Sequence, residues 1–283
     1  MRRGRVDPGT PASGQGLRRR TLLAALGLTA VGTAGGVGVA NVGALRNRFA
    51  DDGPDGVIPE VPEGSVRLER VFSDARGQDV GLFTAVPDGH GDGAGLPVCL
   101  VLHGASATTA DFRRFGLPRF LTVAVRAGVP PFVLAGADGG RTRWEGNPPG
   151  DDPPRMLHDE LPRWCAGRGF DATRIAVYGW SMGGYGALRH AQRHPHRIRA
   201  VAALSPAVGY DDEVMTEASG LVGSRTALWC GTLDPLYDAA RALADRVPGG
   251  PAVAAWDVGR HTRGYWDRVT PDAFRFVGEA LGR

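Results

Sequence analysis

The chain has 283 residues, of which 42% are hydrophobic, so it is long enough to bury the core of one sizeable domain. Its net charge is +3, but residues 1–40 hold six arginines and one aspartate and carry +5, which leaves −2 for the rest. The main part of the chain therefore has no positive surplus with which to bind nucleic acid. All 33 basic residues are arginine, which we attribute to genome composition and not to a binding code.

An export signal is predicted over residues 1–44. Arg18, Arg19 and Arg20 stand before an apolar run at residues 22–40, which is the layout of a twin-arginine signal. The alternative is a membrane anchor, because the run is about long enough to cross a bilayer, although its glycines make it weakly hydrophobic. We expect an exported protein, in the cell envelope or outside the cell, that contacts the membrane only through this signal if it stays uncleaved.

A linker is predicted over residues 45–64, because proline, glycine and aspartate dominate there and leave little apolar surface to pack. The folded domain is expected over residues 65–283. Within it, β-rich apolar runs alternate with helical patterns, which predicts an α/β fold with a mostly parallel, doubly wound sheet and helices on both faces. The predicted strands lie near residues 66–72, 80–85, 97–102, 132–135, 175–178, 200–204, 226–231 and 252–256, and the predicted helices near 117–127, 156–166, after 181, and 237–244.

The buried strand predicted at residues 97–102 ends in the turn His103-Gly104-Ala105-Ser106. A turn after an early strand can supply a backbone N–H group to a developing oxyanion in an active site. Ala105 is the first candidate for this donor, and Ser106 is the second, because the register of the loop is open. We expect His103 to brace the loop and not to transfer protons.

The most informative motif is Gly179-Trp180-Ser181-Met182-Gly183, which lies between a predicted strand and a predicted helix. A Gly-x-Ser-x-Gly turn in this position holds its serine in a strained backbone conformation, and the glycines relieve crowding where strand and helix nearly touch. The N-terminus of the helix directs N–H groups and a positive dipole end toward the serine. Ser181 is therefore the predicted nucleophile, and the N–H of Met182 a predicted oxyanion donor. The alternative is an ordinary serine in a glycine-rich turn.

A serine nucleophile of this kind needs a histidine to take its proton and an acid to orient that histidine. His261 follows the last predicted strand and is the only histidine after residue 197. Asp234 stands in the turn after the preceding strand, the loop that is expected to reach behind the imidazole. The order Ser181, Asp234, His261 is that of α/β-hydrolases. Four other aspartates remain alternatives for the acid: Asp211, Asp212, Asp238 and Asp257.

Trp144 and Trp180 are candidates for a wall of the substrate site, with packing in the core as the alternative. The three cysteines, Cys99, Cys165 and Cys230, are an odd number, and two of them fall in predicted buried strands. We therefore expect them to be packing residues, with a disulfide at Cys165 as an unsupported alternative.

A metal site is conceivable from His190, His194 and His196. These residues lie near the end of a predicted helix, where a solvated face or an interaction with the helix dipole explains histidines better. The run His158-Asp159-Glu160 lacks the two-histidine spacing of a zinc protease. We therefore expect no metal and no other cofactor.

The segment at residues 179–188 resembles the nucleophile region of the putative-esterase family, which includes esterase D (S-formylglutathione hydrolase) and the secreted mycolyltransferases. The resemblance extends over about residues 65–283, through Leu102-His103-Gly104, Asp234 and His261. It implies an α/β-hydrolase fold, and the short stretch at 205–224 implies a minimal cap or none. Trp180 replaces the histidine common before this family's serine, which weakens any transfer of substrate class.

Together these features predict an exported serine hydrolase that cleaves carboxylic esters through an acyl-enzyme on Ser181. An acyltransferase that passes the acyl group to an alcohol or sugar acceptor is the closest alternative, since it would use the same residues. A non-catalytic envelope protein on a hydrolase scaffold is the third. The expected partner is a small-molecule, lipid or sugar ester, with no nucleic acid.

Overall fold

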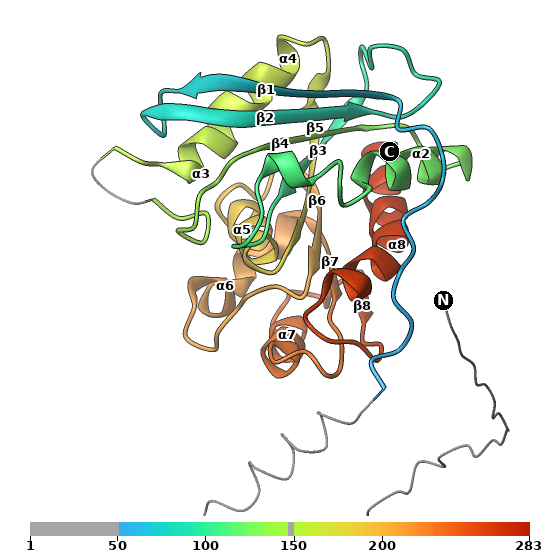
Figure 1. Cartoon of the computed structure of the whole chain (residues 1–283). Coiled ribbons are helices and arrows are strands. Elements are labelled where there is room, and N and C mark those ends of the chain that lie inside the picture. The colour runs from blue at the N-terminus through green and yellow to red at the C-terminus, as the bar shows by residue number, and fades with distance from the viewer. Residues whose placement is uncertain (1–50, 147–149) are drawn as a thin grey trace, which may run out of the picture. The chain divides into compact units, whose positions relative to one another are not determined.

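The structure, a computed structural model, describes residues 51–146 and 150–283, so the predicted export signal lies outside the described residues. The described chain folds around a single sheet with helices on both faces, as predicted from the sequence (Figure 1). None of the helices in these ranges is long and apolar enough to span a membrane.

The sheet is mostly parallel. Its eight strands are β1 (Ser65–Ser73), β2 (Gln78–Val86), β3 (Pro97–Leu102), β4 (Val133–Ala137), β5 (Asp171–Trp180), β6 (Ile198–Leu204), β7 (Arg225–Trp229) and β8 (Val253–Ala255). In space they follow the order β1-β2-β4-β3-β5-β6-β7-β8, in which β1–β2 and β2–β4 are antiparallel and every other neighbouring pair is parallel. Because parallel strands end at one edge, the loops after β3, β5, β7 and β8 meet there.

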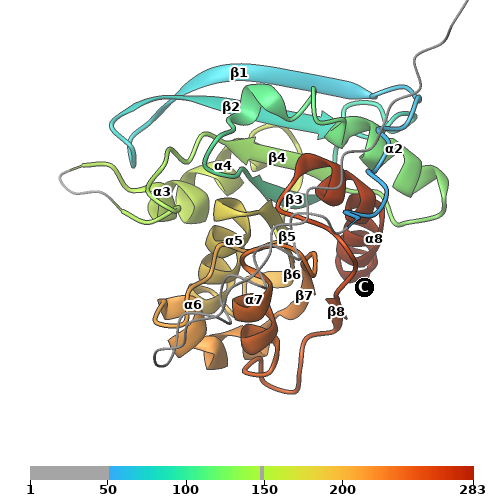
Figure 2. The ribbon, with the colours of Figure 1, turned by 60° about the horizontal axis from the view of Figure 1, so that its bottom comes forward.

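Two layers of helices cover the sheet (Figures 1 and 2). Helices α2 (Leu117–Arg126) and α8 (Arg263–Leu281) bury their apolar sides in one core cluster, and α4 (Leu161–Ala166), α5 (Met182–Arg193) and α7 (Tyr237–Ala244) bury theirs in a second cluster on the opposite face. The central strands are covered on both faces, which explains why their sequences are continuously apolar. The short helical segments are η1 (Thr109–Asp111), α3 (Pro153–Arg155), η2 (Met156–Glu160), α6 (Glu213–Thr216) and η3 (Ala218–Gly223).

Helix α8 is absent from the elements predicted above, and Pro271 in its interior is the reason. A proline inside a helical pattern normally marks its end, since it removes one hydrogen bond. The positive signals were present in the sequence: Thr262 caps the helix by accepting from the N–H of Tyr265, and buried residues recur every fourth position at 265, 269, 273, 277 and 281. This helix begins two residues after His261, so it fixes the C-terminal end of the loop that carries this histidine.

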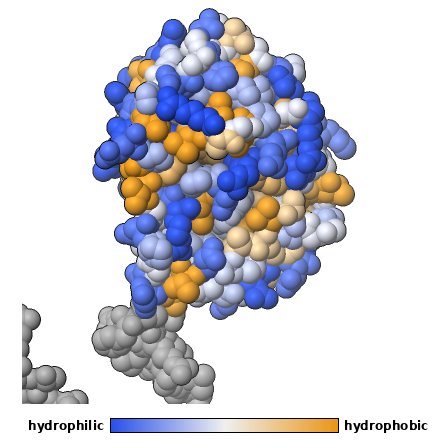
Figure 3. Space-filling view, turned by 90° about the vertical axis from the view of Figure 1, so that its right-hand side faces the viewer, coloured by the Kyte–Doolittle hydropathy of each residue, from blue (hydrophilic) through white to orange (hydrophobic). Residues whose placement is uncertain are grey.

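Residues 51–58, called the strap below, contain no helix or strand but contact the domain alongside α8 (Figure 1). Arg268 donates from Nη1 to the carbonyl of Pro54 at 2.7 Å, and Ile58 packs against Gly116 before α2. The surface on this side is a mosaic of hydrophilic and hydrophobic residues (Figure 3). This packing differs from the little packing expected for a linker, because its glycines let the backbone itself approach the helix.

Candidate active site

Ser181 occupies the sharp turn between β5 and α5. Its backbone has φ 55° and ψ −122°, a region that residues with side chains rarely adopt, and it is the N-cap residue of α5. The flanking glycines are required by contact: a Cβ on Gly179 would overlap the carbonyl of Gly183, and a Cβ on Gly183 would overlap the carbonyl of Leu102. This is the geometry of a nucleophile elbow, as the Gly-x-Ser-x-Gly motif predicts.

The structure brings together the three residues predicted to act as a triad. His261 Nε2 lies 2.8 Å from Ser181 Oγ, and His261 Nδ1 lies 2.8 Å from Asp234 Oδ2. The Asp234 side chain is fully buried, and its Oδ1 accepts from the N–H of Leu236 at 2.9 Å. A carboxylate can only accept a hydrogen bond, so Nδ1 of His261 is the donor in the contact with Asp234, and Nε2 on the other side of the ring faces Ser181 Oγ.

Two loops cross closely to bring Asp234 and His261 together. Leu233 N–H donates to the carbonyl of Gly259 at 2.9 Å, and a Cβ on Gly231 would overlap that same carbonyl. The ring of Trp266, in the first turns of α8, meets the His261 ring edge to face at 4.9 Å. The Leu236 amide was not among the predicted site groups, although an Asp-Pro turn is a recognisable signal for a side chain that accepts from the backbone two residues on.

The alternative acids lie elsewhere. Asp211, Asp238 and Asp257 are exposed, and Asp212 forms an ion pair with Arg143 at 2.6 Å. Asp234 is the aspartate whose carboxylate the structure places against the imidazole of the candidate site.

The loop after β3 lies directly beside Ser181. A Cβ on Gly104 would sit 3.5 Å from the Cβ of Ser181. The amide of Ala105 follows Gly104 directly in the chain. His103 is buried and braces the loop: its Nε2 accepts from the N–H of Gly139 at 2.9 Å, and its Nδ1 lies 2.9 Å from the carbonyl of Gly104. Burial lowers the pKa of His103 and so favours the neutral ring, which can accept from one backbone group while it donates to another.

Trp144 and Trp180 do not form an open substrate wall, because each is only 2% exposed. Trp144 donates to the carbonyl of His103 and packs over Gly139 and Gly186. Trp180 lies in an aromatic cluster of the core with Phe112, Phe115, Tyr178 and Trp266. Packing in the core, the alternative left open by the sequence, therefore describes both. The three cysteines are also buried, as free thiols.

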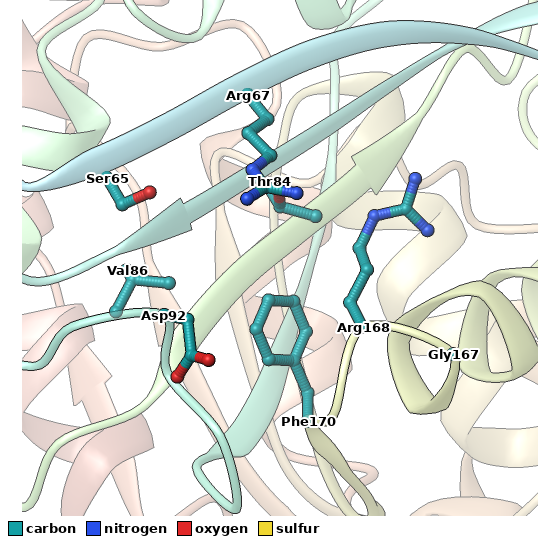
Figure 4. A pocket seen from close by; sticks show the side chains of 8 residues that line it. All are labelled: Ser65, Arg67, Thr84, Val86, Asp92, Gly167, Arg168 and Phe170. Carbon is teal, nitrogen blue, oxygen red and sulfur yellow. The ribbon is translucent and has the colours of Figure 1, made fainter.

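A cavity of about 420 Å³ adjoins the loop beside Ser181. Its walls include His103, Ala105 and Ser106 from that loop, Arg141 from the loop after β4, and residues of the β1–β2 hairpin. A second cavity, of about 200 Å³, lies between β1, β2 and the loop after α4, with Arg67, Arg168 and Phe170 in its walls (Figure 4). None of Ser181, Asp234 and His261 lines this second cavity. None of these three residues lines the first cavity either, but its walls include the loop that lies beside Ser181.

Two of the three histidines considered for a metal site cluster with His158 instead of His196. The rings of His158 and His194 stack at 3.8 Å, and the His190 ring lies 4.9 Å from that of His194. Stacked rings keep their nitrogens in parallel planes and do not direct them to one point. Across the described residues, no group of three histidine, cysteine or acidic side chains is arranged to hold a metal ion.

Comparison with known proteins agrees with this geometry. A family model described as "Putative esterase" matches residues 73–262. Esterase Rv1288 of Mycobacterium tuberculosis (strain H37Rv) is 29% identical over 192 residues, which cover 62% of this chain and 41% of that protein. The chain thus spans about two fifths of the length of the curated relatives that it matches.

Two solved structures share the fold at low sequence identity. An S-formylglutathione hydrolase from Agrobacterium tumefaciens superposes with a TM-score of 0.64 at 18% identity, covering 79% of this chain and 98% of that one. MPT51 (FbpC1) of Mycobacterium tuberculosis superposes with a TM-score of 0.63 at 17% identity, covering 77% and 99%. These likenesses confirm the α/β-hydrolase fold that the sequence predicts.

The histidine cluster predicts a loss of stability in acid. Burial lowers the pKa of His190 to about 3 and that of His194 to about 4. Both are neutral in the folded protein, whereas the unfolded chain takes up protons below about pH 6.5, so stability present above that pH falls as the pH drops toward the folded pKa values. His190 alone should cost about 2 kcal/mol at pH 5.

Urea unfolding at pH 7 and pH 5 measures this cost. His190→Gln should lose about 2 kcal/mol less than the wild type between the two pH values, because glutamine does not titrate. His196→Gln, at an exposed position outside the cluster, is the matched control. An unchanged pH dependence in His190→Gln would contradict the prediction.

Proposed function

The chain belongs to the putative esterase family, and from this premise we propose that it is an exported serine hydrolase that cleaves carboxylic esters through an acyl-enzyme on Ser181. The contact that carries the proposal is the 2.8 Å approach of His261 Nε2 to Ser181 Oγ, with Asp234 behind the ring. This pair of contacts supports a nucleophile whose base is already in place.

In the proposed reaction, Ser181 Oγ attacks the ester carbonyl and forms a bond to its carbon while His261 takes the serine proton. The resulting imidazolium gives this proton to the leaving alcohol as the C–O bond breaks, and Asp234 stabilises the imidazolium in between. Water then attacks the acyl-enzyme with His261 again as base, and the acid product leaves. No cofactor is required at any step.

The oxyanion of each tetrahedral intermediate is proposed to accept from the N–H groups of Met182 and Ala105. Met182 is the first residue of α5, so its amide is one of the free donors at the helix N-terminus. Loss of one such donor typically costs about 3 kcal/mol of transition-state stabilisation.

Acyl transfer to an alcohol or sugar would proceed through the same acyl-enzyme. Hydrolysis is favoured here by access to water: the His261 side chain is 28% exposed, and only the short segments α6 and η3 lie between β6 and β7, where a large cap would be inserted.

The nucleophile is tested by Ser181→Ala. Removal of Oγ should lower kcat for p-nitrophenyl esters by roughly 10⁴- to 10⁶-fold and abolish labelling by a fluorophosphonate probe, while the melting temperature is retained. Ser106→Ala, in the loop beside the site, is the matched control and should still be labelled. Near-wild-type turnover by folded Ser181→Ala would refute the serine mechanism and leave a non-catalytic scaffold as the better description.

The acid is tested by Asp234→Asn. An amide favours the wrong imidazole tautomer and cannot stabilise the imidazolium, so kcat should fall by up to about 10⁴-fold with little change in KM. Asp238→Asn and Asp257→Asn change the charge equally at exposed neighbouring positions and should cost far less. A large loss confined to either control would move the role of acid away from Asp234.

Export is proposed from residues 1–44 alone. Replacing Arg19 and Arg20 with lysine should retain the protein in the cytoplasm, because twin-arginine recognition tolerates this change poorly. Fractionation of cells that express the wild type and the double variant measures the effect. Unchanged export of the variant would point to another secretion route.

A further inference from the structure

Arg141 lines the 420 Å³ cavity together with Ala105 and Ser106, which belong to the loop beside Ser181. Its Nε donates to the backbone carbonyl of Ala105 at 3.2 Å, the residue whose N–H is the proposed oxyanion donor. Gly104, the preceding residue, contacts Ser181. The guanidinium is therefore one hydrogen bond away from the loop that would hold the reacting carbonyl.

Two other charged groups of the cavity are already satisfied. Arg76 forms a two-pronged ion pair with Asp151, at 2.5 and 2.9 Å. The carboxylate of Asp138 accepts from the N–H of Gly81 and from both the N–H and the hydroxyl of Thr109. Neither residue is left to bind a charged ligand.

On the hairpin wall, Arg70 donates from Nη2 to the backbone carbonyl of Asp79 at 2.8 Å. Arg141 is bonded instead to the loop beside Ser181. Over residues 51–146 and 150–283 it has no carboxylate within ion-pair distance, and its bond to Ala105 leaves both terminal nitrogens without a partner. Among the arginines that line the cavity, Arg141 thus combines free terminal donors with a bond to the loop beside Ser181.

We propose that Arg141 binds an anionic group on the substrate, so that the preferred substrates are carboxylic esters carrying a second, negatively charged group, a carboxylate or a phosphate. A guanidinium presents two parallel N–H donors that match two such oxygens. The inference rests on the proposed ester hydrolysis and adds its substrate class. Arg141 is exposed, so for its charge-assisted hydrogen bond about a tenfold effect on kcat/KM is expected, at the lower end for such bonds.

Matched ester pairs test this assignment. Mono-4-nitrophenyl glutarate and 4-nitrophenyl pentanoate share the leaving group and chain length and differ in a terminal carboxylate on the acyl side, while 3-acetoxybenzoate and phenyl acetate differ in a carboxylate on the alcohol side. In at least one pair, Arg141→Gln should lower kcat/KM for the anionic ester about tenfold and change the neutral ester less than about twofold. Arg141→Lys should recover part of the loss, because it keeps the charge.

Arg275→Gln removes an exposed arginine of α8, paired with Asp272, and serves as the control for charge loss. Equal losses on charged and neutral esters would overturn the inference, because Arg141 would then support the loop and not bind substrate. If the wild type hydrolyses the neutral esters but Arg141→Gln shows no selective loss on the anionic ester of either pair, the role of Arg141 is overturned and the proposed function stands. A wild type that hydrolyses none of the four esters would overturn the proposed function as well.

A second inference comes independently from the strap, whose contacts flank His261. Asp52 Oδ1 lies 2.5 Å from Arg260 Nε, one residue before the histidine. The N–H of Gly56 donates to the carbonyl of Gly264 at 2.8 Å, three residues after it. Both ends of the segment that carries His261 are thereby tied to the strap.

The strap and α8 approach each other closely at two glycines. A Cβ on Gly56 would overlap the main chain at Arg268, and a Cβ on Gly264 would overlap the carboxylate of Asp55. Arg268 also donates from Nη2 to the carbonyl of Val258, on the other side of the histidine. Such close approach leaves the His261 segment little room to shift.

We infer that Asp52 and Gly56 are positioning residues for His261, a role that also rests on the proposed function. A displacement of about 1 Å in a reacting group can cost about 10²-fold in rate, so restraint of an irregular, partly exposed segment has a direct kinetic consequence. The strap would act on kcat through His261 without touching substrate.

The test compares Asp52→Asn with Asp51→Asn, and Gly56→Ala with Gly167→Ala. Among the residues that the structure describes, Asp51 has only a local bond to Gly53, and a Cβ on Gly167 meets ordinary contact distances. We expect kcat and the rate of fluorophosphonate inactivation to fall about threefold in Asp52→Asn and about tenfold in Gly56→Ala, with KM within about twofold and both controls unchanged.

Because an exposed ion pair contributes little to stability, Asp52→Asn should keep the wild-type melting temperature and remains informative even if Gly56→Ala folds poorly. A folded Asp52→Asn whose inactivation rate and kcat equal those of the wild type would overturn the positioning role. A loss shared equally by the Asp51 control would do the same. In either case the Ser181 labelling result would leave the proposed function in place.

Discussion

The backbone conformation of Ser181 is the constraint on which the rest of the site depends. A residue held at φ 55° and ψ −122° stores roughly 1–3 kcal/mol and persists only where its surroundings fix it. Its N–H donates to the carbonyl of Leu204 on β6, and its own carbonyl accepts from the N–H groups of Tyr185 and Ala207. The hydrogen bonds of the Ser181 N–H and carbonyl therefore hold this residue in its strained conformation.

This turn dictates how closely the neighbouring backbones approach. With Gly183 against the carbonyl of Leu102, the start of α5 touches the end of β3, and the loop after β3 is brought next to Ser181. The same solution recurs where Gly231 meets Gly259, which lets the Asp234 and His261 loops cross. Glycine at these points serves main-chain proximity, and the reacting side chains meet because the backbones that carry them are in contact.

The sequence predicts most of this architecture because most of it follows from local patterns. A continuously apolar strand such as β3 and a Gly-x-Ser-x-Gly turn are each compatible with few structures. The order of residues along the chain then limits the candidates for the acid and for the histidine. Helix α8 was not predicted, because Pro271 interrupts an apolar repeat that is otherwise typical of a helix. The burial of Trp144 and the packing of the strap depend on residues distant in sequence, and no local pattern encodes them.

His103 and His261 both lie near Ser181, but they differ in burial and in hydrogen-bond partners, and this difference gives them different roles. His103 is 1% exposed, both of its ring nitrogens are engaged by the backbone, and desolvation lowers its pKa, so protonation would cost a hydrogen bond as well as a buried charge. His261 keeps 28% of its side chain exposed, with one nitrogen committed to Asp234 and the other facing Ser181. In the proposed reaction, the proton taken from Ser181 would reside on His261, beside a carboxylate, whereas His103 has no free nitrogen for it. The difference lies in what each ring contacts: the His103 ring braces the loop beside Ser181, and the His261 ring faces Ser181 Oγ directly.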